Sequence, residues 1–98
     1  MNKLNKKEIF DKIISFLKTY NASKIAVFGS YANDSYTENS DIDIIVDFME
    51  QISFLKFVGI QQKLSDYLGI NVDLLTEDSI SPYLLPNIKK EMKILYQN

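Results

Sequence analysis

The sequence predicts a small domain of the α/β (α+β) class, in which helices pack on a mixed three-stranded sheet. Three observations support this prediction: stretches with the apolar spacing of a helix, short runs rich in β-branched residues, and the alternation of the two along the chain. The chain has 98 residues, the length of one typical domain. We therefore expect a single domain over residues 1–98, with the order helix, strand, strand, helix, strand, helix.

The first half of the chain predicts a helix and two strands. Apolar residues spaced as on one helix face run over residues 6–20, and Asn21 is a plausible stop. A buried-strand run over residues 24–28 follows, and a short helix is expected over 30–33. After a polar loop, residues 41–48 are rich in β-branched side chains and predict the second strand.

The second half of the chain predicts a helix, a strand and a closing helix. Residues 53–68 carry helical apolar spacing, and Gly69 suits the position just after a helix. Residues 71–76 predict the third strand. Ser81, followed by proline, is a typical helix start, so a last helix is expected to run from there to about residue 96.

The connections predict how the strands pair. The link between the first two strands is too short for a crossover, so we expect these strands to be antiparallel. The link between the second and third strands holds a whole helix, as a right-handed parallel crossover does. The end of the first strand and the starts of the other two should therefore meet at one edge of the sheet.

The composition excludes several kinds of chemistry. The chain has no Cys, no His and no Arg, so thiolate catalysis, a histidine base and guanidinium anion clamps are absent. Eleven Lys oppose 13 acidic residues for a net charge of −2, which argues against direct nucleic-acid binding. Carboxylates, hydroxyls and lysines remain, and carboxylate chemistry usually recruits Mg²⁺ or Mn²⁺.

Targeting signals are not evident in the sequence. No stretch approaches the 18 or so apolar residues of a membrane span, so no membrane partner is expected. The N-terminal residues lead straight into the first amphipathic pattern, without the apolar core of a signal peptide. The expected location is the cytoplasm.

Two aspartates at the start of the second strand are the leading candidates for a site. Asp41 and Asp43 are two residues apart, so strand alternation places both on one face, about 6.5–7 Å apart. Asp73, at the start of the neighbouring strand, could add a third carboxylate. Three such groups repel one another unless a divalent cation compensates, so without metal at least one pKa should be raised.

A glycine–serine pair ends the first strand at the same edge. Gly29 allows the backbone to approach a ligand closely, and Ser30 adds a hydroxyl at the start of a short helix, where N–H groups favour an anion. A phosphate on this turn would face a metal held by Asp41 and Asp43. A nucleoside triphosphate with Mg²⁺ is the ligand that fits both features.

The combined pattern resembles a known family. Gly29-Ser30, nine residues, Ser40-Asp41-Ile42-Asp43 and a later Asp73 resemble the signature of the polymerase-beta-type nucleotidyltransferase superfamily. The short chain is most similar to the minimal nucleotidyltransferases, which are commonly antitoxin partners of HEPN-domain toxins. The resemblance implies the nucleotidyltransferase fold, ATP as substrate, and transfer of one or more AMP units to a tyrosine hydroxyl of the toxin, which is thereby neutralised.

The same resemblance implies roles for individual carboxylates. Asp41 and Asp43 would bind two Mg²⁺ ions, with Mn²⁺ as a possible substitute. Asp73 would be the third carboxylate, which ligates the catalytic metal and helps to deprotonate the acceptor hydroxyl. The implied enzyme is a protein adenylyltransferase, and a hetero-oligomer with the toxin is expected.

The nucleotide side of the site carries one departure from the family pattern. By resemblance, Gly29 and Ser30 would hold the β- and γ-phosphates, and Ser40 is a further candidate for the nucleotide site, although a structural cap is the more usual role of such a serine. The family usually has Arg-Gly where this chain has Asn33 and Asp34. The change removes a cation and adds a carboxylate near the expected triphosphate.

Two other functions remain open from the sequence. The chain could be an antitoxin that only masks its toxin, with vestigial catalytic residues, as the Asn33-Asp34 departure would allow. It could also adenylylate a small molecule such as an aminoglycoside, although that use normally needs a second domain to hold the acceptor. A template-directed polymerase is disfavoured on the same ground and by the negative net charge.

Three further features are expected to serve the fold. Tyr31 and Tyr36 should pack locally, and Asp47 should be a structural carboxylate at the edge of the sheet. The apolar stripe of the last helix should be mainly core, with room for some partner surface. This stripe consists of Tyr83, Leu84, Leu85, Ile88, Met92 and Leu95.

Overall fold

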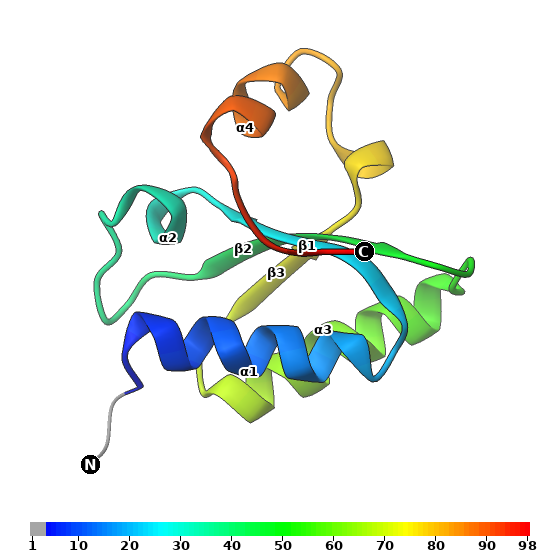
Figure 1. Ribbon diagram of the computed structural model, residues 1–98, viewed down its shortest axis with the longest axis horizontal. Coiled ribbons are helices and arrows are strands. Elements are labelled where there is room, and N and C mark those ends of the chain that lie inside the picture. Colours follow the sequence, from blue (N-terminus) through cyan, green and yellow to red (C-terminus); the bar gives the residue numbers. More distant parts are fainter. Residues whose placement is uncertain (1–3) are drawn as a thin grey trace.

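In the computed structural model, the chain forms a mixed four-stranded sheet with helices on both sides (Figure 1). The structure describes residues 4–98, so the first three residues of the N-terminal stretch considered above lie outside it. The elements, in chain order, are α1 (Lys6–Lys18), β1 (Ala22–Phe28), α2 (Ser30–Asn33), β2 (Ile42–Phe48), α3 (Phe54–Leu68), β3 (Val72–Leu75), the 3₁₀ helix η1 (Glu77–Ser79), α4 (Leu85–Glu91) and β4 (Lys93–Gln97).

Local sequence signals explain where the two long helices begin and end. Asn5 caps α1 by accepting the Glu8 N–H at 2.8 Å, and the Glu8 side chain reaches back to complete a capping box. The Ser53 side chain caps α3 by accepting the Lys56 N–H at 3.2 Å. Gly69 ends α3 in the left-handed conformation, with φ of 68°, as the sequence predicts.

The predicted pairing of the first three strands is confirmed. β1 and β2 are antiparallel, whereas β2 and β3 are parallel, with α3 in the crossover between them. Asp43 is in register with Phe28 on one side and with Asp73 on the other. The end of β1 and the starts of β2 and β3 therefore meet at one edge of the sheet.

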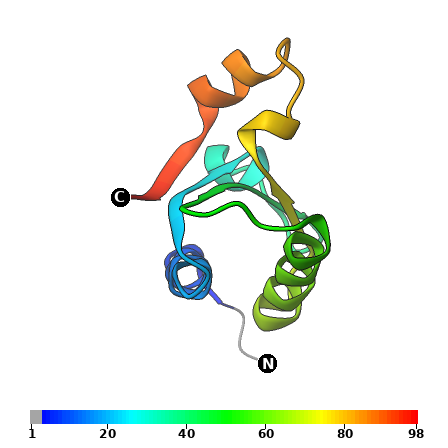
Figure 2. The same ribbon diagram turned by 90° about the vertical axis from the view of Figure 1, so that its right-hand side faces the viewer.

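The two faces of the sheet differ in their covering. α1 and α3 cover one face, where Ile42, Ile44 and Val46 are fully buried (Figure 2). Asp43 and Asp47 alternate with these residues and so belong to the opposite face, which we call the open face. The buried core thus lies between the sheet and the two long helices, and the candidate carboxylates lie on the other side.

The last segment differs from the prediction. The helix expected from Ser81 to residue 96 begins only at Leu85 and ends at Glu91. The chain becomes extended at Met92, and β4 adds a fourth strand on the free edge of β1. β4 forms hydrogen bonds with backbone groups that β1 would otherwise leave unpaired. These bonds outweigh the preference for a helix that the local apolar spacing indicates. The predicted core role of the stripe is also wrong for α4, which buries none of its residues.

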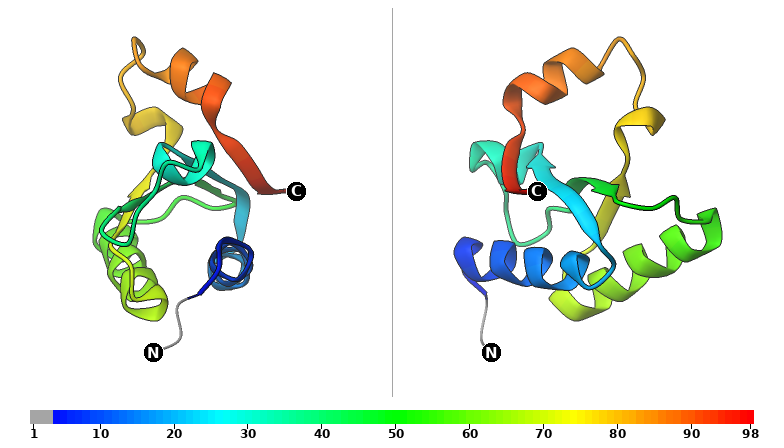
Figure 3. Two further views of the ribbon diagram at one scale, coloured as in Figure 1. Left: turned by 90° about the vertical axis from the view of Figure 1, so that its left-hand side faces the viewer. Right: turned by 45° about the vertical axis from the view of Figure 1, so that its right-hand side comes forward.

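Residues 77–92, which we call the arch, stand over the open face. Figures 2 and 3 show η1 and α4 on the opposite side of the sheet from α1 and α3. The Glu77 carboxylate pairs with the Lys24 ammonium of β1 at 3.2 Å and with that of Lys89 at 3.4 Å. Lys24 lies opposite Asp47 in the strand register, so these ion pairs tether the arch to the open face.

Two more expectations concern residues of this fold. Asp47 lies against the arch tether; burial raises its pKa, and the Glu77 charge adds to the effect, as suits the structural role expected for it. Within the described residues, none of the helices is both long and apolar enough to cross a membrane.

Candidate nucleotidyl-transfer site

The candidate carboxylates gather at the edge where three strands meet. Asp43 is partly buried in β2, and Asp73 is directly opposite in β3, exposed on the same face. Asp41 precedes β2 by one residue and is exposed. The strand register thus brings together residues that are thirty positions apart in the chain, as the predicted parallel crossover requires.

The charges of the neighbouring carboxylates act on Asp43. Burial raises the pKa of the Asp43 carboxyl above its ordinary value, and the negative charges of Asp73 and Asp41 raise it further. The sequence predicts a raised pKa for such a cluster without metal, and Asp43 is the residue that has it. A cation placed beside Asp43 would remove this repulsion.

The donor set suits a hard divalent ion in chemistry. All three candidate ligands are carboxylates, the donors that Mg²⁺ and Mn²⁺ prefer. Across residues 4–98, however, no three acidic side chains converge closely enough to form a ready metal cage. Binding would therefore require the exposed side chains of Asp41 and Asp73 to turn toward Asp43, and metal ligation stays a prediction.

Gly29 brings the start of α2 against Asp43. Its backbone has φ of 70° and ψ of −145°, a conformation that essentially only glycine adopts. A Cβ at this position would lie 2.7 Å from Asp43 Oδ2. The glycine is therefore needed both for the turn and for its close approach to the carboxylate, and Ser30 follows it as the first residue of α2.

Ser40 closes the turn that leads into β2. Its hydroxyl accepts the Thr37 N–H at 2.8 Å, and its own N–H donates to the Thr37 carbonyl at 3.1 Å. These contacts fit the structural cap expected of such a serine. A contact from Ser40 to a nucleotide stays a prediction.

The departure at Asn33 and Asp34 has a local structural explanation. Asn33 Oδ1 accepts the Ser35 N–H at 3.0 Å, which stabilises the turn after α2. Asp34 has φ of 65°, the left-handed conformation that glycine favours and aspartate tolerates. Its carboxylate pairs with the Lys6 ammonium of α1, so the added negative charge is compensated on the α1 side.

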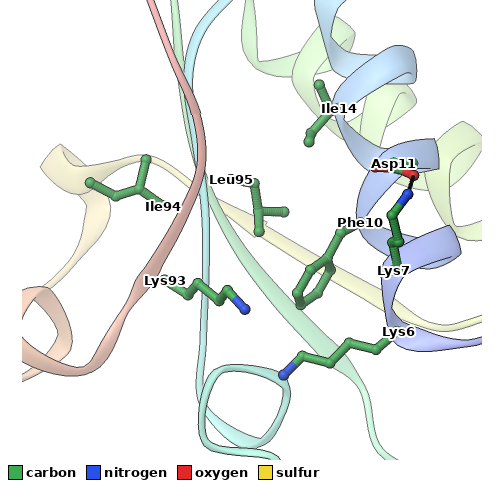
Figure 4. Close-up of a pocket in the computed structure, with 8 residues that line it drawn as sticks. All are labelled: Lys6, Lys7, Phe10, Asp11, Ile14, Lys93, Ile94 and Leu95. Atoms are coloured by element: carbon green, nitrogen blue, oxygen red, sulfur yellow. Dashed lines mark hydrogen bonds and ion pairs between the residues drawn. The ribbon is translucent and has the colours of Figure 1, made fainter.

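Figure 4 shows Lys6 and Lys93 on either side of Phe10, in the pocket between α1 and β4. The ammonium groups of Lys6 and Lys93 each lie 5.5 Å from the centre of the Phe10 ring, beside a cavity of about 490 Å³ between α1 and β4. The Lys6 hydrogen bond and charge lower the pKa of Asp34, with a smaller contribution from Lys93. The sequence alone could not say that these two lysines act on Asp34, because they are 87 positions apart in the chain.

We expect Lys6→Met to return the pKa of Asp34 toward its ordinary value, because Lys6 supplies the largest stabilisation of the charged carboxylate. NMR titration of the Asp34 carboxyl carbon measures this directly. Lys7→Met is the matched control, since Lys7 pairs with Asp11 at 2.9 Å and not with Asp34. An Asp34 pKa that is the same in both variants would contradict the assigned ion pair.

Tyr31 and Tyr36 pack on each other, as expected. Their rings are stacked with centroids 4.3 Å apart and an interplanar angle of 9°. Tyr31 is buried, and this burial raises the pKa of its phenol. The pair holds α2 against the loop that follows it.

The fold and the site together define the class of protein. The family model described as "Nucleotidyltransferase domain" matches residues 10–95. The chain therefore belongs to the nucleotidyltransferase family, and the predicted fold and enzyme class are confirmed apart from the added fourth strand.

Sequence relatives point to one branch of the family. A Methanocaldococcus jannaschii protein, provisionally named as a protein adenylyltransferase, is 47% identical over 88 residues, which cover 88% of this chain and 90% of that protein. The protein adenylyltransferase MntA of Thermococcus cleftensis is 37% identical over 73 residues, 74% of each chain.

Chains from solved toxin–antitoxin structures are similar to this chain in fold. A chain from a toxin–antitoxin crystal structure with AMP-PNP has a TM-score of 0.81 and 31% identity, over 97% of this chain and 75% of that one. A second neighbour comes from a complex of a tri-AMPylated Shewanella oneidensis HEPN toxin with its minimal-nucleotidyltransferase antitoxin; its TM-score is 0.77 at 27% identity, over 96% and 74% of the two chains. The resemblance stated from the sequence is thereby confirmed.

Proposed function

We propose that this chain is an antitoxin that transfers AMP from Mg²⁺-ATP to a tyrosine hydroxyl of a HEPN toxin and so neutralises it. The observation that carries the proposal is the register of Asp43 with Asp73, beside the turn that Gly29 forms against the same carboxylate. Relatives named as protein adenylyltransferases, and neighbours solved in complex with HEPN toxins, support this class of acceptor.

The residues of the chain divide the work of an in-line transfer. Asp41 and Asp43 would hold Mg²⁺, which when bound neutralises phosphate charge and lowers the pKa of the attacking hydroxyl. Ser30 and the backbone at Gly29 would hold the β- and γ-phosphates. The tyrosine oxygen would bond to the α-phosphorus as the bond to pyrophosphate breaks, and Asp73 would help to hold the metal and take the phenolic proton.

The proposal is tested by the intact mass of the HEPN protein encoded beside this chain after co-expression. The wild-type chain should add the mass of one adenylyl group or a multiple of it. Asp41→Asn/Asp43→Asn should add none, and chelation of divalent ions by EDTA should stop transfer by purified wild type. Asp47→Asn is the matched control, because Asp47 shares the strand and face of Asp43 but lies at the other end.

The same experiment separates catalysis from masking. A masking antitoxin would still bind and silence the toxin after the Asp41→Asn/Asp43→Asn change, and the toxin's mass would never shift. The observation that favours this second function is the departure from the family pattern at Asn33 and Asp34. A mass shift with wild type only would exclude it.

A further inference from the structure

The described residues include two pairs of strongly exposed apolar neighbours. Tyr83 and Leu84, in the turn that leads into α4, are 91% and 57% exposed. Phe54 and Leu55, in the first turn of α3, are 78% and 82% exposed. Single exposed apolar residues are ordinary on a protein surface, but adjacent pairs with this exposure are typical of interaction sites.

Only the first pair lies on the side of the sheet where transfer would occur. The arch is tethered to the open face through Glu77, which pairs with Lys24 and Lys89, and the open face carries Asp43. Figure 1 shows α2 and the arch on the same side of the sheet. An acceptor hydroxyl that reaches Asp43 must come from this side of the sheet, the side on which the arch stands.

The second pair lies at the opposite end and on the opposite face. α3 follows the end of β2, whereas Asp43 is near the start of that strand. The first turns of α3 pack beneath the end of β2, where the Phe57 ring meets that of Phe48 at 6.3 Å between centroids. Phe54 and Leu55 therefore belong to a surface that an acceptor at Asp43 would not need to cover.

The arch is built to present a surface rather than to complete the core. α4 has only seven residues, none of them buried, and a helix this short is not stable by itself. The Glu77 ion pairs hold one end and the β4 pairing with β1 holds the other. The outer turn is thus kept in place while its apolar side chains stay uncovered.

We propose that the outer turn of the arch, with Tyr83 and Leu84 at its centre, is the ridge on which the HEPN toxin docks; this inference rests on the proposed function. Tyrosine is among the residues that most often dominate the energy of an interface. The toxin surface that fits such a ridge is an apolar groove.

The test compares the two apolar pairs in the full chain. The probes are the HEPN protein encoded beside this chain, for affinity and AMP transfer, and Mg²⁺-AMP-PNP for nucleotide affinity. Tyr83→Ser/Leu84→Ser should weaken toxin binding by tenfold or more, a loss of about 1.4 kcal/mol. It should raise the KM for toxin to a similar extent while leaving nucleotide affinity and kcat at saturating toxin within about twofold.

Phe54→Ser/Leu55→Ser is the matched control and should leave toxin affinity within about twofold of wild type. The docking proposal is wrong if the Tyr83→Ser/Leu84→Ser variant keeps its toxin affinity. It is also wrong if toxin affinity is lost in the α3 variant instead. Because all four side chains are exposed, the variants should have equal melting temperatures. Equal values exclude unfolding as the cause of lost binding. Failure of the wild-type chain to transfer AMP would contradict the proposed function. The comparison of toxin affinities would still show whether the toxin docks on the ridge.

Discussion

Asp43→Asn is expected to abolish AMP transfer and, at the same time, to raise the thermal stability of the metal-free protein. The partly buried Asp43 carboxylate is disfavoured in its charged form by burial and by the charges of Asp73 and Asp41. An amide of the same shape removes this repulsion but cannot replace the carboxylate as a metal ligand. The chain thus carries a stability cost at the residue on which its chemistry depends.

The two effects are measured separately. Transfer should fall by about a hundredfold or more, the result of losing a few kcal/mol of transition-state stabilisation. In EDTA at neutral pH the melting temperature should rise by a few degrees, since solvent screens a half-exposed carboxylate and limits the gain to roughly 0.5–1 kcal/mol. Full transfer by the variant would remove Asp43 from the site.

Asp47→Asn tests whether loss of any carboxylate on the open face, or only of the one at Asp43, stops transfer. Burial also raises the pKa of Asp47, so this variant too should be slightly more stable at neutral pH. It should keep its transfer activity, because Asp47 lies at the far end of β2, against the arch tether. Loss of transfer in both variants would mean that the open face as a whole, and not the edge at Asp43, carries the reaction.

Gly29→Ala is expected to lower both the free energy of unfolding and the rate of transfer. The backbone at Gly29 has φ of 70°, which costs an alanine about 1–3 kcal/mol. The new methyl group would also lie 2.7 Å from Asp43 Oδ2, so the carboxylate or the turn must move. Chemical denaturation and the toxin-labelling assay measure the two losses.

The other two glycines are matched controls for the two causes. Gly69→Ala shares the positive φ of 68° but meets no atom within 4 Å, so it should lose stability without losing transfer. Gly59→Ala lies within α3, also in open space, and should stabilise the protein by about 0.5–1 kcal/mol. Transfer by Gly29→Ala at the level of Gly69→Ala would show that contact with Asp43 is unimportant.

Elements coded by adjacent residues were predictable from the sequence. The helical spacing over residues 6–20 and 53–68 and the glycine at 69 locate the ends of the long helices within a residue or two. The spacing of Asp41 and Asp43, with a helix-length link to Asp73, was enough to predict that three carboxylates share an edge. Such features depend on backbone preferences and periodicity, which short stretches of sequence carry.

The final strand and the partner of Asp34 were not predictable, because both depend on contacts between distant parts of the chain. The apolar stripe that predicts the last helix extends to Leu95, yet residues 93–97 form β4 because the edge of β1 offers them backbone partners. Asp34 is compensated by Lys6, which the fold brings from 28 positions away. The sequence by itself determined the class of fold and the edge where the carboxylates meet, through local patterns. Only the tertiary structure decided the fourth strand, the arch over the open face and the ion pairs around it, because the energies of these features arise from long-range contacts.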